Sequence, residues 1–474
     1  MIGYLHISSG LGVRDFRILN TYWIILFIGS LLTFLSFFAH LAEAEQRLTL
    51  KEAIEIALEN NHQIRAMKDS VLAEKENIGI ARSYLLPKLT FEERFMRTDN
   101  PTYGFMAKLN QERFAMEDFA IPSLNNPKAI NDFQTMISFE QPLFVRKASL
   151  GLDMSRREFK ARNEEFKRMQ EDLVYNVTKA YLMALTAKEY VRVSEKAVED
   201  ASEHLRIAEV REKTGLGLYS DVLRARTALT EAEQRAVSAK KNLTIALRSL
   251  GLLLGMSEPV EIIEETAEIP VREIDYYIHA STSRKDIEAM KLRYDNAEMN
   301  VKMAKSGYLP IIGIGGSYQF NDHKRPIGSE GSSYHFVAFL RWEIFEGKKR
   351  EHEIAKAKAQ ASEAKEHLEG LKKGIVFKVH EAYQNALEAI KNQELATASL
   401  MSAEEGRRLV RIRYENGLSP LVDLLDAQLN LDHARANLVA MKNNLRTAAL
   451  NLSYEGGTIL NDLAQAIGLK LKAE

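Results

Sequence analysis

The feature that most constrains this chain is an internal duplication. A helix-like run that ends at Leu86-Pro87 and passes into strand-like residues is written again at Leu309-Pro310. One fixed offset relates the pairs Ile64/Ile287, Ala66/Ala289, Met67/Met290, Ala81/Ala304 and Ser83/Ser306. A self-similar chain builds one supersecondary unit twice, so both halves should share one order of elements, with Pro87 and Pro310 at equivalent helix-to-strand junctions.

A second offset then relates the later parts of the two copies. It joins Arg211/Arg413, Gly215/Gly417, Leu216/Leu418, Asp221/Asp423, Leu223/Leu425, Ala225/Ala427, Leu229/Leu431, Ala232/Ala434, Asn242/Asn444 and Ala246/Ala448. The change of offset means that the first copy holds extra residues before its helices. The stretch from Asp99 to Asn131 contains several Pro and Asn residues and a Gly, and we predict a loop there.

Each copy reads helix, strand, strand, helix, helix. No proline occurs between Pro142 and Pro259 or between Pro326 and Pro420, and apolar residues recur three and four apart. Helices from about 148 to 214 and from about 348 to 416 would each reach about 100 Å, which indicates a coiled coil. Each ends at a Gly-containing break, after which a second helix returns as an antiparallel hairpin.

The strand segments alternate in polarity. Ile312, Ile314, Tyr318 and Phe320 share one face, while Gly313, Gly315, Ser317 and Gln319 share the other. Weaker copies of the pattern are Phe133, Thr135, Ile137 and Phe139, and then Tyr334, Phe336, Ala338, Leu340 and Trp342. An apolar outer face with a small polar inner face is typical of a transmembrane barrel strand, although a half-buried strand of a soluble sheet alternates in the same way.

The totals exclude several classes of function. The 64 basic residues nearly cancel the 65 acidic ones, so nucleic acid is not expected as a partner. The absence of cysteine excludes disulfides, thiolate metal sites and a cysteine nucleophile. The histidines lack partners at ligand spacing, and no catalytic constellation is evident. We therefore expect no enzyme, no cofactor and no metal.

The N-terminus has the pattern of a secretory signal. Arg14 and Arg17 precede an apolar run from Tyr22 to Phe38 and the small-x-small site Ala42-Glu43-Ala44. We predict a signal peptide over residues 1–44, with an uncleaved anchor as the alternative. The first repeat is then 45–252, an inter-repeat linker 253–280, the second repeat 281–455 and a C-terminal tail 456–474. No later run of 18 apolar residues follows, so a membrane crossing would have to use strands.

Strands that cross a membrane force the chain to oligomerise. Four strands per chain cannot close a barrel, since about eight is the smallest number that does, and an open edge cannot face lipid. Two copies would give a barrel filled by side chains, whereas three would leave a channel. Helices attached to such a barrel would then form a tube.

At this point the sequence resembles the TolC family of outer-membrane export ducts over roughly residues 48 to 455. The motifs that carry the resemblance are the duplicated element order, Leu48-Thr-Leu-Lys-Glu-Ala, the two Leu-Pro junctions, Gln141-Pro-Leu-Phe144 and Tyr414-Glu-Asn-Gly-Leu-Ser-Pro-Leu-Val-Asp-Leu-Leu-Asp-Ala-Gln428. The resemblance implies a mainly α fold with a small β part. It also implies a homotrimer with a 12-stranded barrel in outer-membrane lipid and a long helical periplasmic coiled-coil barrel. A periplasmic adaptor would join it to an inner-membrane transporter, for efflux or type I secretion. A non-conducting envelope scaffold or tether is the alternative.

The same resemblance suggests roles for residues near the hairpin tips. Asp423 and Asp426 lie three apart on one helix face and would form the entrance gate, although solvated acids at a helix start are the simpler alternative. Tyr414 and Asp221 would form a hydrogen-bonded entrance latch. The family's assisting basic residue falls on Ser419, so Arg411 or Arg413 would replace it. The adaptor-docking tips would be Arg211, Gly215 and Leu216 with Arg413, Gly417 and Leu418.

Overall fold

Both halves of the chain build the same elements in the same order. The computed structural model describes residues 47–258, 260–265 and 267–469, and the predicted signal peptide lies outside them. The first half contains α2 (Leu50–Asn60), α3 (His62–Ser83), β2 (Lys88–Thr98), β3 (Ile130–Phe144), α6 (Arg146–Lys213) and α7 (Tyr219–Leu253). The second contains α8 (Ile274–Ser281), α9 (Lys285–Lys305), β5 (Ile311–Asp322), β6 (Gly331–Arg341), α10 (Lys349–Glu415) and α11 (Leu421–Gly456). The predicted fold class, mainly helical with a small sheet, is confirmed.

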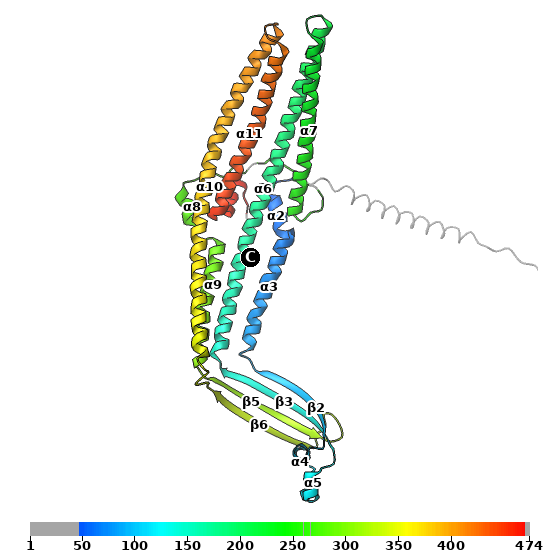
Figure 1. The fold of residues 1–474 in the computed structure, drawn as a ribbon, viewed down its shortest axis with the longest axis vertical. Helices are drawn as coiled ribbons and strands as arrows, with labels where there is room; N and C mark the ends of the chain where they lie inside the picture. The colour runs from blue at the N-terminus through cyan, green and yellow to red at the C-terminus, as the bar shows by residue number, and fades with distance from the viewer. Residues whose placement is uncertain (1–46, 259, 266, 470–474) are drawn as a thin grey trace, which may run out of the picture.

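The molecule is a long rod with the sheet at one end and the tips of two helical hairpins at the other (Figure 1). Helix α6 has 68 residues and α10 has 67, so each extends about 100 Å. Helix α7 returns along α6, and α11 returns along α10 (Figure 1). The helix lengths predicted from the proline-free intervals are therefore right to within two residues at each end.

The equator of the rod holds its largest core. Val174, Val177 and Tyr181, at helical spacing on α6, are fully buried against Leu50 and Ile54 of α2. The Tyr181 hydroxyl lies 3.0 Å from the Leu48 carbonyl oxygen in β1 (Arg47–Leu48), which pairs in parallel with β4 (Glu261–Ile262). The predicted tail also contributes, because α12 (Ile459–Ile467) buries Ile459 and Leu463 in the same core. The inter-repeat segment, which contains β4, therefore packs in this equatorial core.

The sheet has the antiparallel order β2-β3-β5-β6. Its register sets Ile137 opposite both Phe91 and Tyr318, and it sets Phe139 opposite Gly316. These residues form one largely apolar face, in which Glu93 is an exception that accepts a hydrogen bond from Thr135 at 2.5 Å. The other face carries the polar residues Gln134, Ser138, Ser317, Gln319 and His335, with Met136, Val337 and Phe339 as apolar exceptions. The predicted alternation is confirmed, and the longest strand is β3, at 15 residues.

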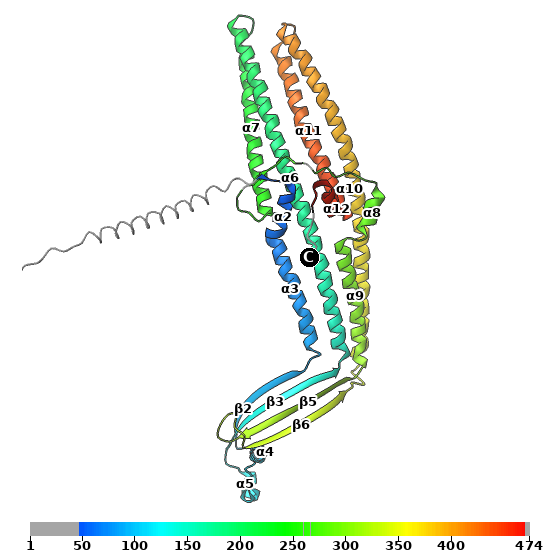
Figure 2. The same ribbon diagram turned by 180° about the vertical axis from the view of Figure 1, so that it is seen from behind.

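The glycines of β5 make room for aromatic rings on both faces. A side chain at Gly316 would lie 2.9 Å from the Phe139 ring, and one at Gly313 would lie 2.6 Å from the Phe339 ring. Pro87 directly precedes β2, and Pro310 directly precedes β5. The sharp bend between helical rod and sheet occurs at these positions (Figure 2).

The prediction of a loop between Asp99 and Asn131 is wrong in part. The segment connects β2 and β3, but it contains α4 (Pro101–Asn110), the short 3₁₀ helix η1 (Met116–Phe119) and α5 (Ile121–Asn125). The Asn100 side chain accepts hydrogen bonds from the backbone N–H groups of Thr102 and Tyr103, with Pro101 in the first turn. Asn-Pro therefore acts here as a helix start rather than as a turn.

Among the helices of the described residues, none combines the length and the apolar character needed to cross a membrane.

Candidate channel entrance

The two hairpin tips end their long helices by the same device. Gly215 and Gly417 have φ values of 76° and 72°, in the left-handed region that glycine tolerates without strain. The N–H of Leu216 donates to the Arg211 carbonyl at 2.8 Å, and the N–H of Leu418 donates to the Arg413 carbonyl at 2.8 Å. These are Schellman caps at equivalent positions of the repeat. Leu216 and Leu418 remain 73% and 78% exposed, so each tip presents a leucine to its surroundings.

Just behind the tips, Tyr414 joins the two hairpins. Its side chain is 5% exposed and packs in a small core. Ala208, Val222 and Ala225 enter that core from the first hairpin, while Leu421 and Leu424 enter from the second. Separation of the hairpins would therefore expose Tyr414 and these alkyl groups to water.

The basic residue that lies against Tyr414 is Arg211. Its guanidinium carbon is 4.9 Å from the centre of the Tyr414 ring, and its Nη1 donates to the Tyr414 carbonyl at 3.3 Å. Burial raises the pKa of the Tyr414 hydroxyl, and the charges of Arg211 and Asp221 act on that pKa in opposite directions. Within the described residues no hydrogen bond joins Tyr414 to Asp221, so the structure brings these two predicted latch residues near each other without the predicted bond.

The two arginines suggested as substitutes for the missing basic residue point elsewhere. Arg411 donates to Glu415 on its own helix at 2.7 Å, and Arg413 is exposed. Ser419, at the position of the missing residue, donates to Asp423 at 2.7 Å. Sequence reasoning placed Arg211 only in the docking tip, because its contact with Tyr414 joins helices from different repeats.

Asp423 and Asp426 lie near the start of α11, three residues apart and both exposed. Asp426 forms no ion pair with any of the described residues. The geometry therefore leaves the two carboxylates together on one surface of the second hairpin, close to its tip.

A second contact between the hairpins, absent from the sequence predictions, is a buried polar cluster. Gln428 of α11 donates to Asp200 of α6 at 3.2 Å and accepts from Arg407 of α10 at 3.0 Å. Arg435 donates to the same Asp200 oxygen at 3.1 Å, and His204 Nε2 lies 3.4 Å from Gln428 Oε1. Asp200 and His204 are four apart in the small-residue stripe of Ala197, Ala201 and Ala208, which is the sequence signal that could have revealed them.

The surroundings of the cluster shift the pKa values of three of its side chains. Burial lowers the pKa of the His204 imidazole. Burial raises the pKa of the Asp200 carboxyl, but the hydrogen bond from Arg435 and the charges of Lys196 and Arg407 outweigh it and lower that pKa. Burial raises the pKa of Asp432. The charged groups that act on His204 are Asp200, Glu203, Arg407 and Arg411, and Asp200 in turn pairs with Lys196 and with Arg435, which also pairs with Asp432.

We predict that acidification separates the hairpins through His204. A neutral buried histidine stabilises packing above its ordinary pKa of about 6.5, and this stabilisation is lost as the pH falls below that value. The Asp200 contribution persists to lower pH, and Asp432 opposes the change as the pH falls through its raised pKa towards the ordinary carboxyl value of about 4. The distance between spin labels on cysteines introduced at Lys213 and Asn416 should increase between about pH 7.5 and about pH 5.5. His204→Gln should remove this increase, and persistence of the increase in that variant would contradict the assignment.

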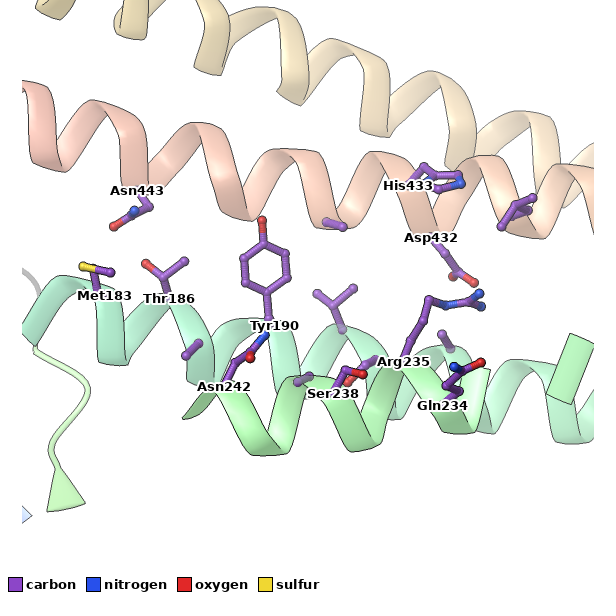
Figure 3. Close-up of a pocket in the computed structure, with 17 residues that line it drawn as sticks. Met183, Thr186, Tyr190, Gln234, Arg235, Ser238, Asn242, Asp432, His433 and Asn443 are labelled. Atoms are coloured by element: carbon purple, nitrogen blue, oxygen red, sulfur yellow. The ribbon is translucent and has the colours of Figure 1, made fainter. Parts of the chain in front are cut away.

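A cavity of about 610 Å³ lies between the first hairpin and α11, on the equatorial side of the cluster (Figure 3). Tyr190, Arg235 and Asn242 line it from the first hairpin, and Asp432, His433 and Asn443 line it from α11. The hairpins are thus joined at the tip core and at the polar cluster, with open space between them nearer the equator.

The described residues contain one cluster that could hold a metal ion, Asp322, His323 and Glu330, in the β5–β6 turn. Its atoms already have partners, because Asp322 accepts from the backbone N–H of Lys324 at 2.7 Å and Glu330 lies 2.5 Å from His323 Nδ1. These contacts indicate that the three side chains stabilise the turn. It was not anticipated from the sequence, since the three residues are joined only by the turn.

Comparison with known proteins agrees with this geometry. The profile of a family described as outer membrane efflux protein matches residues 53–256 and 277–454. The outer membrane protein TolC of Vibrio cholerae is 24% identical over 440 residues, covering 89% of this chain and 94% of that protein. Protein CyaE of Bordetella pertussis is 24% identical over 421 residues, covering 87% of this chain and 84% of that protein.

Solved structures show the same fold. The crystal structure of CusC has a TM-score of 0.74 at 16% identity and covers 86% of this chain and 91% of that chain. A membrane protein from Pseudomonas aeruginosa has a TM-score of 0.73 at 19% identity and covers 88% of this chain and 94% of that chain.

A duplicated helical rod attached to a two-faced antiparallel sheet is thus the fold that this chain shares with solved membrane proteins. The chain belongs to the outer membrane efflux protein family, the TolC family. It is an outer-membrane efflux or secretion channel and not an enzyme.

Proposed function

We propose that three copies of this chain form one continuous conduit across the outer membrane and periplasm. Their sheets would close a 12-stranded barrel, and their hairpins would close a helical tube. The observation that carries the proposal is the sheet order, in which β2 and β6 are both edge strands. An unpaired edge cannot face lipid, so β6 of one copy would pair with β2 of the next.

The two faces of the sheet support the same assembly. The face with Phe91, Ile137, Tyr318 and Phe336 would contact outer-membrane lipid, and the face with Ser138 and Ser317 would line the lumen. A closed barrel of this size leaves an aqueous interior, whereas about eight strands would be filled by side chains. The two repeats, 45–252 and 281–455, would then each supply one half of a subunit's wall.

The partners would meet the conduit at the hairpin tips. Leu216 and Leu418, exposed beside the capped ends at Gly215 and Gly417, offer matched apolar contacts to the helices of a periplasmic adaptor. Arg211 and Arg413 flank them in the last helical turns. The adaptor would connect the conduit to an inner-membrane transporter, which would supply the energy that a passive channel lacks.

The closed entrance would be held by the contacts between hairpins. Asp423 and Asp426 of three copies would form two rings of carboxylates there, and Tyr414 with Arg211 and Asp221 would form the latch. Opening would separate α10 and α11 from the first hairpin, breaking the tip core and the polar cluster.

The latch provides a test of conduction. Tyr414→Ala should increase single-channel conductance in planar bilayers, because it removes a nearly fully buried ring from the core that joins the hairpins, a loss of about 3 to 5 kcal/mol. Tyr219→Ala is the matched control, since that tyrosine is 64% exposed at the tip of the other hairpin. Protein that inserts into bilayers without conducting in any of these forms would instead favour the non-conducting scaffold.

A further inference from the structure

The segment between β2 and β3 is fastened to the polar face of the sheet at its distal end, away from the helical rod (Figure 2). Gln111 Nε2 donates to Asp132 Oδ1 at 2.8 Å, and Asn321 Nδ2 donates to both oxygens of the same carboxylate at 2.9 and 3.0 Å. Asp132 lies two residues from Gln134 on β3, and Asn321 lies two residues from Gln319 on β5. Both therefore belong to the polar face. The three side chains are 1 to 4% exposed.

The fastening extends across three strands. Helix α4 contacts β3, β5 and β6, and a side chain at Gly331, the first residue of β6, would overlap the carbonyl oxygen of Asn110. A buried carboxylate with all its hydrogen bonds made by amides fixes this geometry, because any displacement would leave a charge unsatisfied. Helix α4 is therefore held at the distal end of the polar face, and α5 lies beyond the ends of the strands (Figure 1).

The segment also has an internal structure of its own. Phe114 packs edge-to-face on Phe105 at 4.8 Å and on Phe119 at 5.0 Å between ring centres. Lys108 pairs with Asp118 at 2.5 Å, and the Asp118 carboxylate accepts from the N–H of Ala115 at 3.0 Å. These contacts hold η1 in a fixed position relative to α4, and α5 packs against both.

An apolar rim on the segment remains largely exposed in the described part of the subunit. Met116 is 83% exposed, Ile121 73%, Phe119 59% and Met106 53%. Such a concentration of exposed apolar groups marks a contact surface. Lipid is not the expected partner, because the segment is attached to the face opposite Phe91, Ile137 and Tyr318.

We propose that residues 99–131 form a lid over the distal mouth of the lumen, and that the apolar rim of each lid packs against the rims of the other two copies. The inference rests on the proposed trimer, in which an element attached to the lumen face of each sheet is directed towards the shared axis. Burial of the rims between copies removes from water the side chains that one subunit leaves exposed. The buried carboxylate of Asp132 holds each lid at the height where the three meet.

The test exploits the absence of cysteine from the chain. A single cysteine is introduced at Gln319, on the lumen face two residues from Asn321, and another in a separate protein at Lys324, in the exposed β5–β6 turn. Full-length protein in intact outer membranes is labelled from outside with a small maleimide and with one carried on a wide polyethylene glycol chain. The small probe should label both positions, whereas the wide probe should label Lys324→Cys rapidly and Gln319→Cys slowly.

Opening the lid should remove the difference. Met116→Ser with Ile121→Ser should accelerate wide-probe labelling of Gln319→Cys by at least about tenfold, since two apolar side chains no longer favour the closed arrangement. Gln111→Ala, which removes one amide from Asp132, should act in the same direction. Equal wide-probe labelling of Gln319→Cys and Lys324→Cys with an unaltered lid would overturn the proposal.

Contact between lids is tested separately. Met116→Cys should be joined between copies by a short bis-maleimide, giving linked chains on a denaturing gel, and pretreatment with a monofunctional maleimide should prevent this. Each protein is also run unheated to detect the trimer. A trimer without cross-linking would overturn the rim contact alone, whereas absence of a trimer would overturn both the lid and the proposed assembly.

Discussion

Replacing Asp423 and Asp426 together by alanine should weaken the block of the channel by trivalent cations by at least about tenfold. In a trimer the change removes six carboxylates from a narrow entrance. Two unit charges about 4 Å apart interact by about 1 kcal/mol in water and by about 4 kcal/mol at the effective dielectric of a protein surface, and 1.4 kcal/mol corresponds to a tenfold change in affinity. Preference for cations over anions should fall at the same time.

The experiment is a planar-bilayer recording with increasing concentrations of the blocking ion on the side of the hairpin tips. Glu231→Ala with Glu233→Ala is the matched control, because it removes the same charge from exposed positions on α7. The control should block as the unaltered protein does. If both double variants block normally, Asp423 and Asp426 are solvated acids favoured at the helix start.

A lysine at Ile137 should destabilise insertion of the sheet by about 2 to 4 kcal/mol, whereas a lysine at the neighbouring Ser138 should have little effect. Ile137 lies on the apolar face between Phe91 and Tyr318, and Ser138 lies on the opposite face beside Ser317. A charge facing the middle of the bilayer carries that cost, while a charge facing an aqueous lumen does not.

The comparison isolates the direction of the side chain, since the two positions are adjacent on one strand. The yield of heat-resistant oligomer in outer membranes should fall strongly for Ile137→Lys and remain near that of the unaltered protein for Ser138→Lys. The reverse order would mean that the faces are exchanged, and equal yields would mean that neither face contacts lipid.

The parts of the fold that could be predicted are those determined by local chemistry. Long helices are predicted by the proline-free intervals between Pro142 and Pro259 and between Pro326 and Pro420, and glycine marks their ends. The alternation in β5 predicts which of its residues share a face. The segment between β2 and β3 was misjudged because Asn100-Pro101 is compatible with both a turn and a helix start. In the structure the Asn100 cap and the packing of Gln111 on the sheet both favour the helix.

The parts of the entrance that could not be predicted depend on contacts between the two repeats. Arg211 and Tyr414 are far apart in sequence, and nothing near either one indicates that the guanidinium covers the ring. Asp200 and His204 lie on one helix and Gln428 lies on another. The relative rotation of the two helices determines whether these side chains meet. A pattern on one helix identifies the buried face, but it does not identify the polar partner that meets it.

The measurement that tests the account most directly is the mass of the purified mature protein in detergent by light scattering with the detergent contribution subtracted. The account predicts three copies per particle, because the unpaired edges of β2 and β6 require neighbours and twelve strands leave a lumen. A monomer that stays dispersed without detergent, or a particle of two copies, would contradict it.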